Sequence, residues 1–389
     1  MRDVAVLGVG MHAFGKFPEK SVTELCRTAV TAALADAGIS WREVEAVAAA
    51  SSRFSGGKGW GLNGNDVVED MGLTGIPVYN MSAGCAAGGN AFNIGYSLVA
   101  GGLYDVVLVV GGEKMQKGFI QTSGVEEDTD PEYLRQRCVG MPGPAFWALL
   151  CRQRMAELGT TEEQLAKVAV KAHQVAVHNE YARFRKEFTL EMILGSNMVS
   201  DPLRLFEICP VSDGAAAAII CAAEIAHKYE ATPVKVLASE LCTGTFVTGY
   251  RDMTVPEITV RGAKEAYGSA GVGPEDIDVA EIHDAFSIAE LLYYEAFGFC
   301  GRGEAIGLLE DGVTSLGGAK PVNPSGGLLS KGHPVGATGV AQITEIVRQL
   351  RGMCGPRQVD GARTGLAHAT GGGAMGMDHG ACSIHILQS

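Results

Sequence analysis

The sequence lacks the features that would place this protein on a nucleic acid or in a membrane. It carries 31 lysines and arginines against 44 acidic residues, which gives a formal net charge of -13. Nucleic-acid phosphates bind to basic faces, so this charge argues against such a partner. The longest run of small apolar residues, Gly214 to Ala226, is too short to cross a bilayer. We therefore expect no nucleic acid and no membrane among the partners.

Targeting and metal motifs are also missing. The first residues, Met1 to Val6, are typical of a strand and not of a secretory signal. Ten cysteines are scattered along the chain without a CxxC pair, and no cysteine–histidine spacing predicts a zinc site. This usage favours a cytoplasmic protein with reduced thiols, most of them buried, and no bound metal.

What is present indicates a tightly packed α/β protein. The chain has 389 residues, of which 47% are hydrophobic and 53 are glycine. That length can hold two or three domains with full cores. Continuous apolar segments at 105–111 and 215–220 predict strands in sheets that are covered on both faces.

The chain also repeats itself. Residues 35–45 align without a gap with residues 268–278, and each copy reads as a helix, a glycine cap, a short turn and a strand. Two flanking matches extend the repeat: 3–8 with 233–238, and 77–80 with 321–324. A repeat of this length predicts a duplicated βαβ domain whose halves face each other, with a ligand site where their strand ends meet.

Cys85 and two histidines are the candidate reactive side chains. Cys85 lies where an extended segment runs into small residues that begin a helix, and the helix dipole there would favour its thiolate, a nucleophile. The repeat predicts that Cys85 and His333 start equivalent helices of the two halves. His283 follows a predicted strand. One cysteine and two histidines in such settings suggest covalent acyl transfer.

The segment from 117 to 205 has no counterpart in the second half. It contains charged helical stretches such as 161–168. We expect an insertion that caps the site and shapes an acyl pocket. Residues 141–147 are its candidate pocket-lining turn, with ordinary packing as the alternative.

A set of short motifs in a fixed order resembles the thiolase superfamily over nearly the whole chain. The His-Asp-X-Phe form at 283–286 resembles the sterol-carrier-protein-linked and archaeal-type branch, which is acetyl-CoA acetyltransferase-like. The motifs are the Cys85 turn, 111–115, 212–216, 283–286, 323–327, 332–334 and 368–373.

The resemblance implies a fold, a co-substrate and partners. The fold is α/β, a five-layer αβαβα arrangement of two duplicated βαβ halves with an inserted loop domain. The implied boundaries are an N-terminal half at 1–116 completed by 206–228, an insertion at 117–205 and a C-terminal half at 229–389. Coenzyme A is the implied co-substrate, with no cofactor bound in this chain. A homodimer or larger assembly is implied, and some relatives work beside a small zinc-ribbon/OB-fold acyl-CoA-binding subunit.

The resemblance also implies roles for individual residues. Cys85 attacks the 3-keto carbon of a 3-oxoacyl-CoA, and His283 and His333 stabilise the departing enolate. His333 also takes the Cys85 proton. Backbone N–H groups of Cys85 and of Gly371, Gly372 and Gly373 hold the other oxyanion. His368 and Asn323 are two further candidates, for orienting the glycine turn and for holding a water or building a turn.

Two positions depart from the family pattern. Thiolases carry a second cysteine that moves the proton at carbon 2, and its two usual positions are Ala285 and Ala369 here. Three explanations stay open. The chain is a thiolase for an unusual, bulky or aromatic substrate of the benzoylsuccinyl-CoA type; a thiolase-fold aldolase that splits a 3-hydroxyacyl-CoA such as a sterol side-chain thioester; or a non-catalytic acyl-CoA carrier. The presence of Cys85 favours the first.

Overall fold

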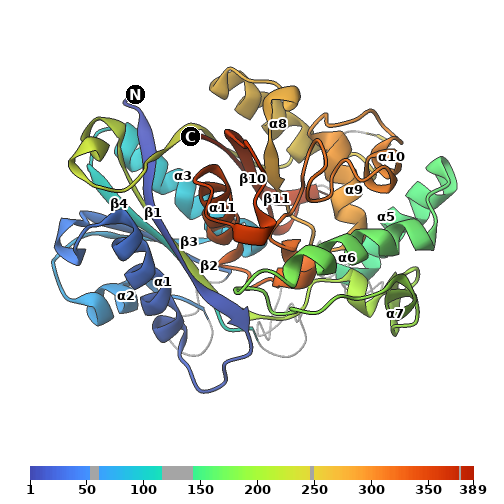
Figure 1. The fold of residues 1–389 in the computed structure, drawn as a ribbon, viewed down its shortest axis with the longest axis horizontal. Coiled ribbons are helices and arrows are strands. Elements are labelled where there is room, and N and C mark those ends of the chain that lie inside the picture. Colours follow the sequence, from blue (N-terminus) through green and yellow to red (C-terminus); the bar gives the residue numbers. More distant parts are fainter. Residues whose placement is uncertain (53–60, 116–142, 246–248, 376–377) are drawn as a thin grey trace.

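The computed structural model describes residues 1–52, 61–115, 143–245, 249–375 and 378–389 (Figure 1). Nine strands of this part of the chain form one mixed sheet, in the order β3-β2-β4-β7-β1-β8-β11-β10-β9. Their bounds are β1 Val4–Gly15, β2 Ala46–Ser51, β3 Val78–Ser82, β4 Val106–Glu113, β7 Asp213–Ala222, β8 Val234–Cys242, β9 Val279–Glu281, β10 Thr364–Met375 and β11 Asp378–Gln388.

The predicted duplication is confirmed by the strand pairing. From the centre outwards, the first half reads β1, β7, β4 and β2, and the second reads β8, β11, β10 and β9. In each half the first two contacts are antiparallel and the third is parallel. The outermost strand β3 has its counterpart in the parallel bridge between Ala280 and Val322. The glycine caps of the repeat are also found, since Gly38 and Gly271 end their helices with φ of 67° and 69°.

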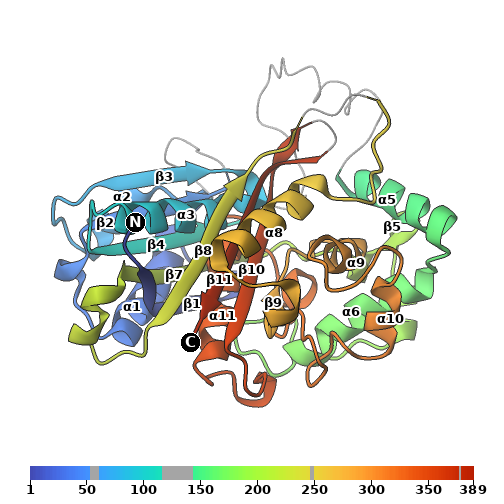
Figure 2. The ribbon, with the colours of Figure 1, turned by 90° about the horizontal axis from the view of Figure 1, so that it is seen from above.

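Helices complete five layers around the two half-sheets. Outer helices α1 (Val22–Ala37) and α8 (Glu257–Ala270) cover the far faces, and α3 (Ala87–Ala100) and α11 (Thr338–Leu350) lie between the halves. The half-sheets are not separate, because Val4–Val6 of β1 pairs antiparallel with Val234–Val236 of β8. Figure 2 shows the resulting continuous, twisted sheet.

Glycines let the two central helices touch. A methyl group on Gly339 of α11 would lie 2.3 Å from the backbone nitrogen of Gly89 in α3. One on Gly88 would lie 2.9 Å from the nitrogens of Gly339 and Val340. No side chain fits at this crossing, so the helices that follow the two candidate reactive residues pack backbone against backbone.

The substitution Gly339→Ala is therefore expected to destabilise the protein by about 3 kcal/mol, because the new methyl group meets backbone that cannot move aside. Chemical denaturation of purified protein measures this change. Gly268→Ala is the matched control, since Gly268 lies in α8 with nothing within 4 Å of the added methyl group. The control should be neutral or slightly stabilising, and an equal loss in both variants would contradict the crossing argument.

The expected insertion contains three helices in its described part. They are α5 (Gly143–Leu158), α6 (Glu162–Ala176) and α7 (Leu190–Leu194), beside the short strands β5 (Met198–Ser200) and β6 (Leu203–Arg204). The predicted helical stretch at 161–168 is confirmed, and Thr161 and Gln164 cap it reciprocally. Of the expected turn at 141–147, Met141 and Pro142 lie outside the described residues, and 143–147 is the first part of α5 rather than a turn.

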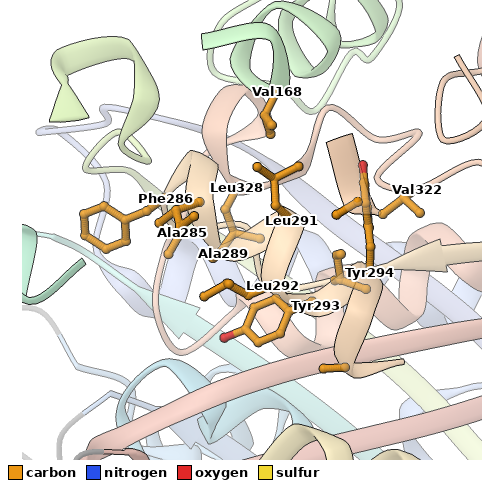
Figure 3. Close-up of a cluster of buried hydrophobic side chains, with 14 of the residues drawn as sticks. Val168, Ala285, Phe286, Ala289, Leu291, Leu292, Tyr293, Tyr294, Val322 and Leu328 are labelled. Carbon is orange, nitrogen blue, oxygen red and sulfur yellow. The ribbon is translucent and has the colours of Figure 1, made fainter. Parts of the chain in front are cut away.

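The insertion packs on the second half through α6. In Figure 3, Val168 of α6 lies above Leu291 of α9 (Ser287–Ala296) and near Leu328, in one buried apolar cluster. A shorter helix, α10 (Ala305–Glu310), flanks α9. Among the described residues, no helix combines the length and the apolar character needed to span a membrane.

Candidate active site

Cys85 lies in a single helical turn, Gly84–Ala86, between β3 and α3. Gly84 has a φ of 51°, which turns the chain there. The turn rests on the glycine segment of β10, since a methyl group on Gly371 would lie 2.7 Å from the backbone nitrogen of Cys85. The structure thus brings Cys85 against Gly371, and Gly84 of the same turn against Gly372, whereas for Gly373 only its position on β10 is described.

The two histidines come from the other half and meet Cys85. His283 follows β9, and His333 lies in the turn before α11. Their ring centroids are 5.0 Å apart at an interplanar angle of 80°. The sulfur of Cys85 and one nitrogen of each ring all lie within 4.8 Å of one another. Cys85 and His333, which are 248 positions apart (333 − 85), therefore share one cluster, as the repeat predicts.

A threonine that sequence reasoning missed fixes the tautomer of His333. The Oγ1 of Thr338 lies 2.6 Å from Nδ1 of His333 and donates its own hydrogen to the carbonyl of Pro334, 3.0 Å away. Because a hydroxyl has one hydrogen, Nδ1 must be the donor in the first bond. The neutral ring then carries its proton on Nδ1, and Nε2 is the basic nitrogen.

Burial opposes the effect that the helix dipole was expected to have on the Cys85 thiol. Burial, and then the Glu113 carboxylate, raise the pKa of the Cys85 thiol to about 12. Burial lowers the pKa of His333 to about 3, and burial together with the neighbouring ring of His333 holds that of His283 well below its usual range. Desolvation thus outweighs the local helix dipole. At neutral pH the pair is a thiol beside a neutral imidazole, so the proton must move as the sulfur attacks.

Thr338→Val is expected to lower kcat/KM by about 10²-fold, because the ring of His333 loses the partner that holds Nε2 unprotonated. Thr338→Ser keeps the hydroxyl and should keep most of the activity. Steady-state kinetics on both variants measures the difference, with circular dichroism as the check on folding. An equal loss in the serine variant would point to packing of the methyl group instead.

His368 lies behind His283 rather than in the cluster. It is buried, and its Nδ1 accepts a long hydrogen bond of 3.5 Å from the backbone N–H of His283. Its Nε2 lies 3.4 Å from the hydroxyl of Thr259, and its ring meets Tyr293 edge-on. These contacts favour a role in positioning the His283 backbone.

Asn323 is engaged by its own surroundings. Its Oδ1 accepts from the N–H of Ile282 at 2.8 Å, and its Nδ2 donates to Glu290 at 2.8 Å. Its φ of 56° belongs to a turn. Of the two expected roles, these bonds favour building the turn next to His283 over holding a water.

Glu113 is a second residue whose role the sequence did not reveal. It ends β4 inside the 111–115 motif and is fully buried. Its carboxylate accepts from the N–H of Ser52 at 2.8 Å and from the N–H of Gly336 at 3.0 Å. It therefore links the first half to the turn that carries His333. In the sequence, only its place in the 111–115 motif indicated that Glu113 has a role.

Two alanines occupy the expected positions of the second cysteine. Ala285 and Ala369 are 5% and 2% exposed, and neither methyl group can carry a proton. Cys85, His283 and His333 have the atom types that bind zinc. In the described part of the chain, they form the single group of three such residues whose ligand atoms lie close enough together to hold a metal ion. The expectation of no metal stays a prediction.

Comparisons with known proteins agree along the whole chain. The family models of the thiolase N-terminal domain and of the thiolase C-terminal domain-like region match residues 4–224 and 239–384. An acetyl-CoA acetyltransferase of Methanothermobacter thermautotrophicus is 41% identical over 100% of both chains. The benzoylsuccinyl-CoA thiolase subunit BbsB of Thauera aromatica is 36% identical over 98% of each.

A solved structure extends the agreement to three dimensions. The structure described as an Ltp2-ChsH2(DUF35) aldolase is 26% identical, with a TM-score of 0.85, over 100% of this chain and 98% of that one. Family models that span both halves, and full-length relatives well above 30% identity, establish the kinship. The chain belongs to the thiolase family of acyltransferases.

Proposed function

We infer that this enzyme cleaves a 3-oxoacyl-CoA with coenzyme A through an acyl group carried on Cys85. The observation that supports this most is the cluster of Cys85 with His283 and His333, whose reactive atoms lie within 4.8 Å of one another. A sulfur nucleophile, a base with a defined tautomer and a second imidazole are the parts that carbon–carbon cleavage by acyl transfer needs.

In the first half of the reaction, Nε2 of His333 takes the Cys85 proton as the sulfur bonds to carbon 3. The bond between carbons 2 and 3 then breaks, and its electrons pass into the thioester enolate. His333 now carries a hydrogen on Nε2, so it donates to the enolate oxygen together with His283. Backbone N–H groups of Cys85 and of the Gly371–Gly373 segment hold the oxygen on carbon 3.

In the second half, the coenzyme A sulfur attacks the acyl group on Cys85, and over the whole cycle its thiol proton replaces the proton that carbon 2 of the enolate takes up. The tetrahedral intermediate collapses, the new acyl-CoA leaves, and the Cys85 sulfur recovers its proton from His333. Because the resting pKa values are those of a thiol and a neutral imidazole, the chain begins and ends the cycle in the same state.

The acyl group is proposed to be bulky or aromatic. Trp147 of α5 stacks on Phe286 with centroids 5.1 Å apart and an interplanar angle of 20°. Figure 3 shows Phe286 next to Ala285, at the end of the cluster and turned away from Leu291. Phe286 is three residues from His283 along the chain, so this aromatic pair is joined to the segment that carries a proposed catalytic histidine. The relative named for benzoylsuccinyl-CoA is consistent with such a substrate.

Intact-protein mass spectrometry tests the proposal. The protein is incubated with short-chain, branched and aromatic acyl-CoA esters, and a mass increase localised to Cys85 is expected with the aromatic esters. Trp147→Ala should shift the preference towards short chains, whereas Trp41→Ala, which removes an indole remote from Phe286, should not. Absence of an adduct with every ester would reject the acyl-enzyme.

A second candidate function is retro-aldol cleavage of a 3-hydroxyacyl-CoA. It is favoured by the likeness to the aldolase structure and by alanine at positions 285 and 369. An aldolase needs a base and an enolate site but no acyl group on Cys85. Cleavage of a 3-hydroxyacyl-CoA without added coenzyme A, surviving Cys85→Ala, would select this function.

Partners and location follow as parts of the same proposal. Acyl-CoA and coenzyme A are the proposed substrates, and a cytoplasmic homodimer is the proposed form. A small acyl-CoA-binding subunit is proposed as well, because one relative is named as a subunit and the aldolase is named with a DUF35 partner. The division into 1–116 with 206–228, 117–205 and 229–389 is retained as a proposal. Light scattering of the purified chain, alone and with the co-expressed subunit, tests the assembly.

A further inference from the structure

The thiolase reaction proposed above leaves one proton without a carrier. After the bond between carbons 2 and 3 breaks, carbon 2 must be protonated, and the two positions where the family keeps a cysteine for this are Ala285 and Ala369. His333 and His283 face the enolate oxygen in that proposal. An acid is therefore needed on the side of carbon 2.

Cys209 lies directly opposite Ala285. Ile208 forms an antiparallel bridge with Phe286, and one residue further along the N–H of Cys209 donates to the carbonyl of Ala285 at 2.9 Å. Residues that oppose each other across antiparallel backbone present their side chains on the same face, with Cβ atoms about 5 Å apart. The thiol of Cys209 is thus on the face where a cysteine at 285 would present its own.

The same short segment also touches the other histidine. Val211 forms a parallel bridge with His333, so residues 208–211 run between the segment that carries His283 and the turn that carries His333. Backbone pairing thus fixes Cys209 opposite Ala285 on one side, and fixes Val211, two residues further on, against His333.

The surroundings of Cys209 suit an acid rather than a second nucleophile. The residue is 4% exposed and packs with Ala285 and Phe286 in one apolar cluster. Burial, followed by the charges of Cys85 and Asp284, raises its pKa well above the ordinary value. Among the described residues, Nδ1 of the buried His283 also has no hydrogen-bond partner.

We propose that Cys209 is the catalytic acid and base at carbon 2, in place of the cysteine absent from positions 285 and 369. The step balances within the thiolase reaction. As the enolate forms, the S–H of Cys209 gives its proton to carbon 2, and the shortened acyl-CoA leaves. The Cys209 thiolate then takes the proton of the incoming coenzyme A thiol, whose sulfur attacks the acyl group on Cys85.

The experiment separates this proton from acylation. The probe is the acyl-CoA, from a panel of acetyl-, propionyl-, succinyl- and phenylacetyl-CoA, that acylates Cys85 of the unaltered protein; each of these carries hydrogen on carbon 2. Acylation is read by mass spectrometry at its end point. Exchange of the carbon 2 hydrogen is followed in deuterated water. Cys209→Ala should lower the exchange rate by about 10²-fold or more, while Cys85 still takes up the acyl group.

A rescue and a matched control sharpen the result. Adding Ala285→Cys to Cys209→Ala puts a thiol on the opposing residue, and exchange should return to within about tenfold of the unaltered protein. Cys221→Ala removes another buried thiol, in β7, and should leave both readouts unchanged. If Cys209→Ala folds poorly, Cys209→Ser replaces it and should slow exchange, while the rescue variant should restore exchange. Unchanged exchange in Cys209→Ser together with no restoration in the rescue variant counts against the proposal.

The outcomes distinguish this inference from the function on which it rests. Acylation of Cys85 with exchange unaffected by Cys209→Ala overturns the role of Cys209 and leaves the thiolase reaction standing. Loss of both acylation and exchange in a folded variant also overturns it. Failure of the unaltered protein to be acylated by any ester rejects the proposed function itself.

Discussion

Cys85→Ala is expected to abolish carbon–carbon cleavage, with a loss in kcat/KM of at least about 10⁴-fold, because no other group can form the acyl intermediate. The substitution removes one sulfur atom from a partly exposed turn and leaves the contact of that turn with Gly371 in place. Substrate affinity and folding should therefore be preserved. Activity in the presence of coenzyme A, together with a binding isotherm for the substrate, measures the two effects separately.

The control for this prediction is Cys354→Ala. Cys354 is a buried cysteine outside the cluster of Cys85, His283 and His333, and its thiol donates to Glu345 at 3.5 Å. Its loss should leave kcat/KM unchanged. Retention of cleavage in Cys85→Ala, above all without coenzyme A, would contradict the thiolase reaction and favour the aldolase.

His333→Gln is expected to lower kcat/KM by about 10³-fold, through loss of the base that receives the Cys85 proton. The pH dependence carries the stronger test. In the unaltered enzyme the reactive pair is neutral between the pKa of His333 at about 3 and that of Cys85 at about 12. Neither group changes its charge across the physiological range, so these two residues should give kcat/KM no slope there.

The variant should behave differently. Without the imidazole, only the Cys85 thiolate can attack, and its fraction rises tenfold with each pH unit below its pKa. The logarithm of kcat/KM should therefore rise with pH at about unit slope in His333→Gln alone. His227→Gln, at an exposed histidine with no assigned role, is the control. A flat profile in His333→Gln would show that His333 is not the base.

Local and repeated features were predictable from the sequence. The glycine caps at Gly38 and Gly271 and the matched strands follow from short patterns, because a left-handed cap and a buried strand are decided by a few neighbouring residues. The meeting of Cys85 with His333 followed from the repeat, since equivalent points of two facing halves come together. The family motifs added His283, which the structure also brings into the cluster.

Long-range contacts were not predictable in the same way. Thr338 is an ordinary first residue of a helix until its hydroxyl is seen against His333. Glu113 meets Gly336 across 223 residues of sequence. Cys209 reaches Ala285 through one backbone pairing that no periodicity reveals. The effect of burial on the pKa of Cys85 was not predictable for the same reason, because a helix dipole can be read locally whereas burial is set by the whole fold.

Because α3 and α11 cross backbone against backbone, catalytic activity depends on the relative position of the two duplicated halves. Cys85 precedes α3 and His333 precedes α11, so a slight separation at Gly89 and Gly339 would pull the reacting atoms apart while both half-sheets stayed intact. During mild heating or in dilute denaturant, turnover should therefore vanish before circular dichroism registers any loss of structure.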